Sequence, residues 1–163
     1  SEAMKALVCR EFGALDRLQV CELPAPPLPK GHVRVKVACA SVNYPDALMV
    51  QGLYQVKPPL PFVPGAECAG TVIEAGEGVT QLRAGDRVLA LCWTGAFATE
   101  TVVDARLVLP LPAGVDPALA AALPMTYGTA YHALLDRARL QAGETLLVQG
   151  GGGGVGLAAV ELG

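Results

Sequence analysis

Hydrophobic and polar residues alternate most regularly along His32–Ala38, where valines are separated by basic side chains. A period of two is typical of a strand that buries one of its faces. Five other short runs, rich in β-branched and apolar residues, are separated by glycine and proline turns. They cover Lys5–Cys9, Leu18–Glu22, Glu67–Ala75, Arg87–Trp93 and Phe97–Val103. So many short strands predict a compact, barrel-like β domain.

Two proline signals indicate helix starts. Pro45 opens a short helix that we expect to reach about Val50. Asp116-Pro117 combines a capping residue with a first-turn proline. Two helices, broken at Pro124, are expected after it: Ala118–Leu123 and Met125–Arg137.

The last stretch of the chain combines an apolar run with glycines. Thr145–Gln149 is typical of a buried strand, and Leu157–Leu162 is typical of the first turns of a helix. Between them, Gly151, Gly153 and Gly156 form a G-x-G-x-x-G pattern. Strand, glycine turn and helix start together favour a nucleotide-binding turn, in which the helix N-terminus receives a pyrophosphate. The alternative is a flexible glycine-rich tail.

At Gly153 we expect a positive φ that a branched side chain would disfavour. The strand at Thr145–Gln149 has no expected sheet neighbour within the 163 residues. We therefore expect residues from about Gln141 onward to be disordered or to be stabilised by a second copy, through self-association of this strand.

Composition narrows the class of protein. The chain is 52% hydrophobic and 17% charged with a net charge of −3, and it has no run of Lys or Arg. These values argue against a nucleic-acid surface and favour a small-molecule partner. Five cysteines are scattered singly without a C-x-x-C pair, which suits a reducing compartment. We expect the cytoplasm, with the mitochondrion left open. Pro117–Leu135 carries no formal charge but is too polar for a membrane span.

Four motifs occur in an order that resembles the medium-chain dehydrogenase/reductase superfamily. They are Ser41-Val-Asn-Tyr-Pro-Asp46, Pro64-Gly-Ala-Glu67 followed by Gly70, Gly85-Asp-Arg-Val88, and Gly150–Gly156. The chain resembles the quinone oxidoreductase branch, which includes zeta-crystallin. The resemblance implies a mixed α/β fold with the active site in a cleft between two domains. A GroES-like β-barrel-type domain would span residues 1–116, connecting helices 117–140, and the first strand and helix start of a Rossmann fold 141–163.

The branch assignment depends on metal ligands. Zinc-dependent members of the superfamily place a cysteine where this chain has Asn43 and a histidine where it has Ala66. An amide and a methyl group cannot replace the thiolate and imidazole that zinc binds. We therefore expect no zinc. His32 and His132 are interpreted as structural or surface histidines.

The resemblance also implies site residues. On the substrate side these are Asn43, Asp46 and Tyr54, the last in a proline-rich loop over residues 51–65 that could wall a pocket. Asn43 could orient the nicotinamide ribose or donate to a substrate oxygen, and Tyr54 could donate to the oxygen that gains charge. Asn43 and Asp46 could equally form a helix cap. Glu67 is interpreted as a structural carboxylate.

On the cofactor side the implied residues precede and form the glycine turn. They are Met125, Tyr127, Thr129, Gly151, Gly153, Gly154, Val155 and Gly156. Thr129 offers a hydroxyl for the nicotinamide carboxamide. Packing within a helix is the alternative, above all for Met125.

The resemblance implies NADPH-dependent hydride transfer to a quinone or an α,β-unsaturated carbonyl without a metal, and NADH remains a possible cofactor. We expect the 163 residues alone to be inactive. A non-catalytic GroES-like binding module is the second hypothesis, and a zinc alcohol dehydrogenase is the disfavoured third.

Overall fold

The structure is a computed structural model that describes residues 3–163. Its contacts divide the chain into two compact units, Ser1–Ala121 and Ala122–Gly163, which are described separately.

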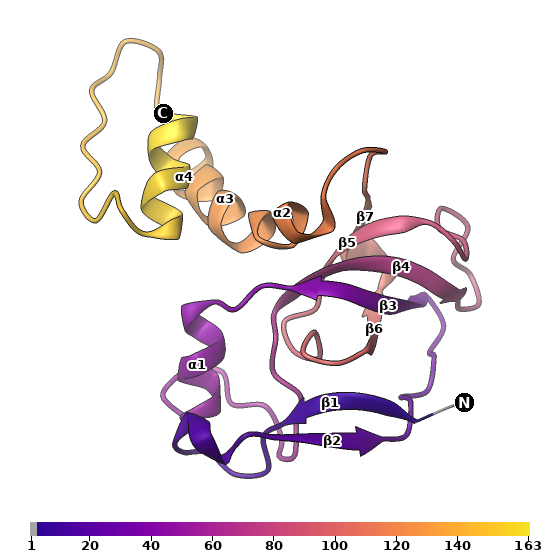
Figure 1. Ribbon diagram of the computed structural model, residues 1–163. Coiled ribbons are helices and arrows are strands. Elements are labelled where there is room, and N and C mark those ends of the chain that lie inside the picture. Colours follow the sequence, from indigo (N-terminus) through magenta and orange to yellow (C-terminus); the bar gives the residue numbers. More distant parts are fainter. Residues whose placement is uncertain (1–2) are drawn as a thin grey trace. The chain divides into compact units, whose positions relative to one another are not determined.

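The first unit is built on two antiparallel sheets (Figure 1). The larger has the strand order β6-β3-β4-β5-β7, and the smaller pairs β1 with β2. The bounds are β1 Met4–Val8, β2 Gln19–Leu23, β3 His32–Ala40, β4 Glu67–Ala75, β5 Arg87–Leu91, β6 Glu100–Asp104 and β7 Val108–Pro110. Short 3-10 turns occupy Leu15–Arg17 and Ala105–Leu107. The expected mixed α/β fold with a β domain at its start is confirmed.

Alternation along β3 explains the position of the core. Val33 and Val35 are fully buried and pack with Val72 of β4 and Val88 of β5, while Lys36 on the other face is exposed. This burial removes the apolar face of each strand from water, which is the main force that holds the sheet together. The strand expected from the pattern is therefore present, and it extends to Ala40.

The run expected as a strand over Phe97–Val103 divides between the two sheets. Phe97 and Thr99 exchange backbone hydrogen bonds with β1, from Leu7 N to Phe97 O (2.8 Å) and from Thr99 N to Lys5 O (2.8 Å). Only from Glu100 does the chain enter β6 beside β3. The expected single strand is wrong, because its two halves have different neighbours. Strand β7 was not expected, since three residues are too few to show a period.

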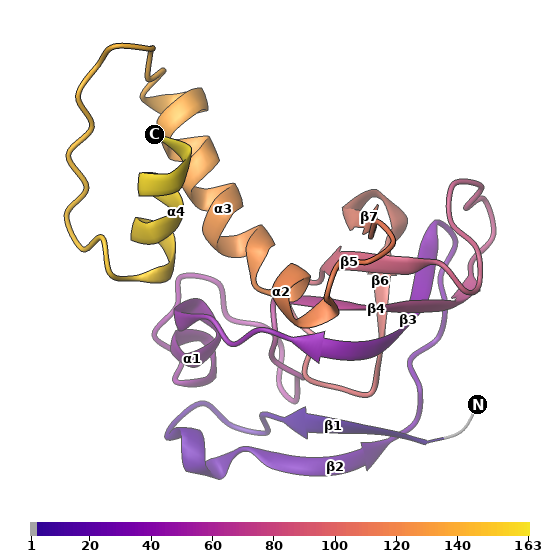
Figure 2. The ribbon, with the colours of Figure 1, turned by 45° about the horizontal axis from the view of Figure 1, so that its top comes forward.

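Helix α1 (Tyr44–Val50) begins beside Pro45, as expected. Helix α2 (Pro117–Ala121) belongs to the first unit and packs its buried Ala120 and Ala121 against Ala69 of β4 (Figure 2). The break between the two helices, which was expected at Pro124, lies between Ala121 and Leu123. Helix α3 (Leu123–Tyr131) includes Pro124 in its first turn, where a missing N–H costs nothing.

The second unit consists of α3, its continuation as a π-helix over His132–Arg137, and α4 (Gly154–Leu162). Helices α3 and α4 pack together, with Ala130 and Ala158 buried. The strand expected at Thr145–Gln149 is wrong, since the structure has no strand there. A strand needs a hydrogen-bonded neighbour, and no described residue pairs with this segment.

Candidate active site

Three segments of the first unit meet at a buried carboxylate. Ser41 follows β3, Asn43 caps α1, and Glu67 opens β4. The Ser41 hydroxyl donates to Glu67 Oε1, and Asn43 Nδ2 lies 2.9 Å from the same oxygen and 3.1 Å from Ser41 Oγ. Glu67 is fully buried. These donors satisfy a charge that would otherwise be costly to bury.

The network fixes the orientation of the Asn43 side chain. Because a carboxylate only accepts hydrogen bonds, the amide presents its NH2 group to Glu67. Glu67 Oε1 and Ser41 Oγ are themselves hydrogen-bonded, so they lie in nearly the same direction from Asn43 Nδ2 and share its donation. The Oδ1 atom can only accept. The two roles expected for Asn43, orienting a ribose hydroxyl and donating to a substrate oxygen, both stay predictions.

Asp46 locks α1 to the segment before β4. Its Oδ2 accepts the Asn43 backbone N–H at 2.8 Å in a capping-box arrangement, and its side chain is buried. Burial raises the pKa of Asp46, amide donors from Asn43, Ala66 and Gly65 lower it, and the charge of Glu67 raises it further. The capping alternative is therefore present. With 4% of its surface exposed, Asp46 acts on a substrate only through what it positions.

Tyr54 lies apart from this network. Its ring packs on an apolar cluster of Cys9, Met49, Val50 and Phe62, and it is half-buried. Within residues 3–163 its hydroxyl forms no hydrogen bond. Tyr54 thus offers a donor that nothing in the described chain occupies.

In the second unit, the expected residues on α3 have local partners. The Thr129 hydroxyl donates to the Met125 carbonyl, which leaves Thr129 Oγ1 as an acceptor for an amide such as a carboxamide. The Tyr127 hydroxyl bonds to Glu161 of α4, and this bond raises the pKa of Tyr127. Helix packing therefore accounts for Tyr127 without a ligand.

The glycine turn leads directly into α4. Gly153 N donates to Gly150 O (3.1 Å), and Gly153 is the N-cap with φ −82°. The expected positive φ at Gly153 is wrong, since the turn places it at Gly150 (φ +73°). A Cβ at Gly156 would lie 2.3 Å from Gly150 O, so only glycine fits there. A Cβ at Gly152 would meet nothing within 4 Å.

This turn fits the pyrophosphate of a dinucleotide. The first-turn N–H groups at Gly154 and Val155 have no partner within the helix, and a Cβ at Gly152 would meet no atom within 4 Å. The adjoining Thr145–Gln149 segment lacks the strand that anchors such turns in a sheet.

The site has two features that the sequence did not indicate. The first is Ser41, which belongs to the Ser41–Asp46 motif and whose place two residues before Asn43 was the available signal. Cys68 and Cys92, which looked isolated, have sulfur atoms 3.8 Å apart. The hydrogen bond with Cys68 and burial raise the pKa of Cys92 far above its ordinary value, so it stays a thiol at neutral pH.

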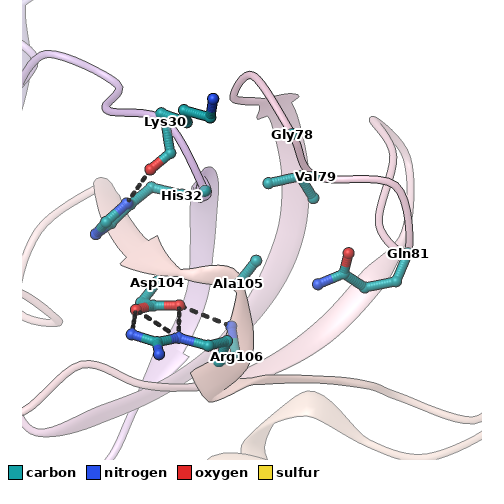
Figure 3. Close-up of a pocket in the computed structure, with 9 residues that line it drawn as sticks. Lys30, His32, Gly78, Val79, Gln81, Asp104, Ala105 and Arg106 are labelled. Atoms are coloured by element: carbon teal, nitrogen blue, oxygen red, sulfur yellow. Dashed lines mark hydrogen bonds and ion pairs between the residues drawn. The ribbon is translucent and has the colours of Figure 1, made fainter.

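A cavity of about 340 Å³ lies at the opposite end of β3 (Figure 3). Its charged groups already have partners: Arg106 binds Asp104, Lys30 binds Glu77, and His32 Nδ1 lies 3.0 Å from Lys30 O. None of the expected site residues lines it. Within residues 3–163 no three His, Cys, Asp or Glu side chains are grouped as metal ligands. Among the described helices, none combines the length and apolar character needed to cross a bilayer.

Comparison with known proteins gives one family match and three relatives. The family model described as alcohol dehydrogenase GroES-like domain matches residues 29–113. Quinone oxidoreductase-like protein 2 of Rattus norvegicus is 39% identical over 99% of this chain and 46% of its own length. The crystal structure of human synaptic vesicle membrane protein VAT-1 homolog-like protein superposes with a TM-score of 0.95 at 34% identity, covering 99% of this chain and 52% of that one.

The quinone oxidoreductase of Thermus thermophilus, whose structure is also known in complex with NADPH, gives a TM-score of 0.84 at 36% identity. That match covers 97% of this chain and 49% of the other. The chain spans about half the length of the curated relatives it matches.

Proposed function

The chain belongs to the medium-chain dehydrogenase/reductase superfamily, and from this membership we propose that it forms the substrate-side part of an NADPH-dependent, zinc-independent quinone oxidoreductase. The substrates would be quinones or α,β-unsaturated carbonyl compounds. The similarity to quinone oxidoreductases supports the class of reaction.

One observation carries the zinc-independent part of the proposal. Where zinc-dependent members hold a thiolate and an imidazole, this chain has Asn43 and Ala66, and the Asn43 amide is bound into the Ser41–Glu67 network. The nitrogen of a neutral amide does not bind a cation, because its lone pair is delocalised into the carbonyl group. Glu67 instead accepts hydrogen bonds from Ser41 and Asn43.

The chain's own residues would divide the work as follows. The glycine turn at Gly150–Gly156 and the start of α4 would hold the pyrophosphate. Asn43 Oδ1 would accept from a ribose hydroxyl, and the free Tyr54 hydroxyl would donate to the carbonyl oxygen that gains charge. The bound nicotinamide would supply the hydride.

The test uses a longer polypeptide in which this chain is continued by a complete nucleotide-binding domain. We expect it to oxidise NADPH when 2-methyl-1,4-naphthoquinone is added, and to keep this activity after treatment with a strong chelator. Asn43→Ala should raise the KM for NADPH about tenfold, because a lost hydrogen bond of about 1.4 kcal/mol weakens binding by that factor. Val42→Ala, at an exposed neighbour, should not. Loss of activity on chelation would overturn the assignment in favour of a zinc enzyme.

The unpaired Thr145–Gln149 segment favours a second candidate for the 163 residues by themselves. Without a sheet behind the glycine turn, the chain would bind a small molecule at its β domain but not turn it over. The 163-residue chain assayed beside the longer polypeptide separates the two: turnover by both would exclude the binding-module hypothesis.

A further inference from the structure

Trp93 has a backbone conformation that is disfavoured for its side chain. Its φ is +62°, and Thr94 N donates to Cys92 O at 2.7 Å, so Trp93 forms the apex of a three-residue turn. This left-handed conformation is disfavoured for a bulky side chain and is natural for glycine. Tight turns of this hand are rare and strained. Such outliers persist where the surroundings enforce them, and they cluster at functional sites.

Backbone hydrogen bonds to neighbouring segments hold Trp93 in this conformation. Cys92 N and Trp93 N both donate to Ala66 O, at 2.7 and 3.0 Å, and Gly95 N donates to Val63 O at 2.7 Å. Ala66 directly precedes Glu67, and its backbone also meets the Asp46 carboxylate. These hydrogen bonds therefore hold the Trp93 backbone against the segment that leads into Glu67.

The indole is nevertheless 56% exposed, so it contributes little to the core. Two more large side chains flank Asn43 and are exposed: Val42 (79%) and Tyr44 (76%). Single exposed hydrophobic residues are ordinary. Here, however, Val42 and Tyr44 adjoin Asn43 in sequence. Trp93 occupies a strained turn whose backbone is hydrogen-bonded to Ala66, the residue before Glu67.

We propose that Trp93 is a specificity-determining residue that stacks on the flat, conjugated ring of the substrate. This inference rests on the proposed function for the class of substrate. An indole presents an electron-rich face, and quinones are flat and electron-poor, so an offset stack is favourable for both. Trp93 then selects ring-containing substrates over small acyclic enones.

The chain offers a direct probe, because Trp93 is its only tryptophan. We expect 2-methyl-1,4-naphthoquinone to quench Trp93 fluorescence with saturation in the 163-residue chain. The saturated analogue 1,4-cyclohexanedione should not quench. Val20→Ala, an exposed apolar residue on β2, keeps the fluorophore and should leave the titration unchanged. Quenching that rises linearly, with the slope of free N-acetyltryptophanamide, would overturn the proposal.

A second measurement separates a binding role from a structural one. Trp93→Gly adopts the positive φ without strain, while the added entropy of its unfolded chain opposes this gain, so its melting temperature should stay within a few degrees of the parent. Calorimetry should show naphthoquinone affinity falling about tenfold, the upper end for one aromatic pair. Trp93→Phe should lose about threefold. Unchanged affinity in Trp93→Gly would contradict the proposal.

Failure of the proposed function has a different signature. If the longer polypeptide reduces no quinone but the fluorescence titration still saturates, the reductase proposal fails and the stacking role stands. If it reduces naphthoquinone, and Trp93→Gly leaves the KM for naphthoquinone and for 3-buten-2-one equally unaffected, only the role of Trp93 fails.

Discussion

At the scale of single residues, the site depends on how Asn43 divides its hydrogen bonds. Its NH2 group holds Ser41 and Glu67, and its carbonyl oxygen can only accept. The same side chain therefore contributes to the stability of the network, and we expect it also to contribute to binding.

Replacing Asn43 by alanine removes a donor from a fully buried carboxylate. We expect Asn43→Ala to lower the free energy of unfolding by about 2–3 kcal/mol, as for lost hydrogen bonds to charged groups. Urea unfolding followed by Trp93 fluorescence measures it. Val42→Ala next to it should stay within about 0.5 kcal/mol. Equal effects of the two variants would show that the network contributes nothing to stability.

Asp46 gives the stability a defined pH dependence. Burial raises its pKa above the ordinary 3.8, so the folded state binds the proton more tightly than the unfolded state. Its stabilising contribution is present below about pH 3.8 and is lost as the pH rises through the raised pKa. We expect the unfolding free energy of Asp46→Asn not to fall over this pH range. Measuring the unfolding free energies of the parent and of Asp46→Asn from about pH 4 upward tests this prediction. Parallel pH curves for the parent and the variant would refute it.

Asp104 changes stability in a different window. Its hydrogen bonds from Arg106 hold its pKa below 3.8, so its contribution is present above that value and is lost as the pH falls. As the pH falls, the contribution of Asp46 is therefore gained and that of Asp104 is lost.

At the scale of elements, the turn into α4 depends on close approach of the backbone at Gly156. A methyl group there would meet Gly150 O at 2.3 Å, so the turn must open. We expect Gly156→Ala to weaken NADPH binding by the longer polypeptide at least about tenfold, measured by calorimetry, because the helix N–H groups move away from the pyrophosphate. Gly152→Ala, where a methyl group meets nothing, is the matched control.

The absence of a strand at Thr145–Gln149 should be visible in hydrogen exchange. Its amides lack a ladder and should exchange fast in dilute solution, while those of Val33–Val37 should be slow because both neighbours of β3 are present. Protection of Thr145–Gln149 that grows with protein concentration would support self-association through this segment. Strong protection independent of concentration would contradict the structure.

At the scale of the whole molecule, the two units differ in how much they bury. The first has a core of fully buried valines, whereas the second buries little more than Ala130, Leu134 and Ala158. Little apolar burial gives little stability.

We expect the two units to unfold separately. Trp93 reports only on the first unit, while the circular dichroism of helices includes α3 and α4 of the second. Part of the helical signal should be lost at a lower urea concentration than the Trp93 signal. Coincident transitions would show that the units unfold as one.

The sequence by itself determined the features that depend on neighbouring residues. The alternation in β3 predicts its buried valines, Pro45 predicts the start of α1, and the glycine pattern predicts the turn before α4. In each case the cause is local, through a side-chain period or a restricted backbone angle.

Only the tertiary structure decided what depends on distant residues. Glu67 lies more than twenty residues from Ser41 and Asn43, and antiparallel pairing of β3 with β4 brings them together. Pairing of β4 with β5 likewise brings Cys68 to Cys92. For Thr145–Gln149 the pattern predicted a strand and the structure has none, because a strand is completed by hydrogen bonds to a neighbour that its own residues do not supply.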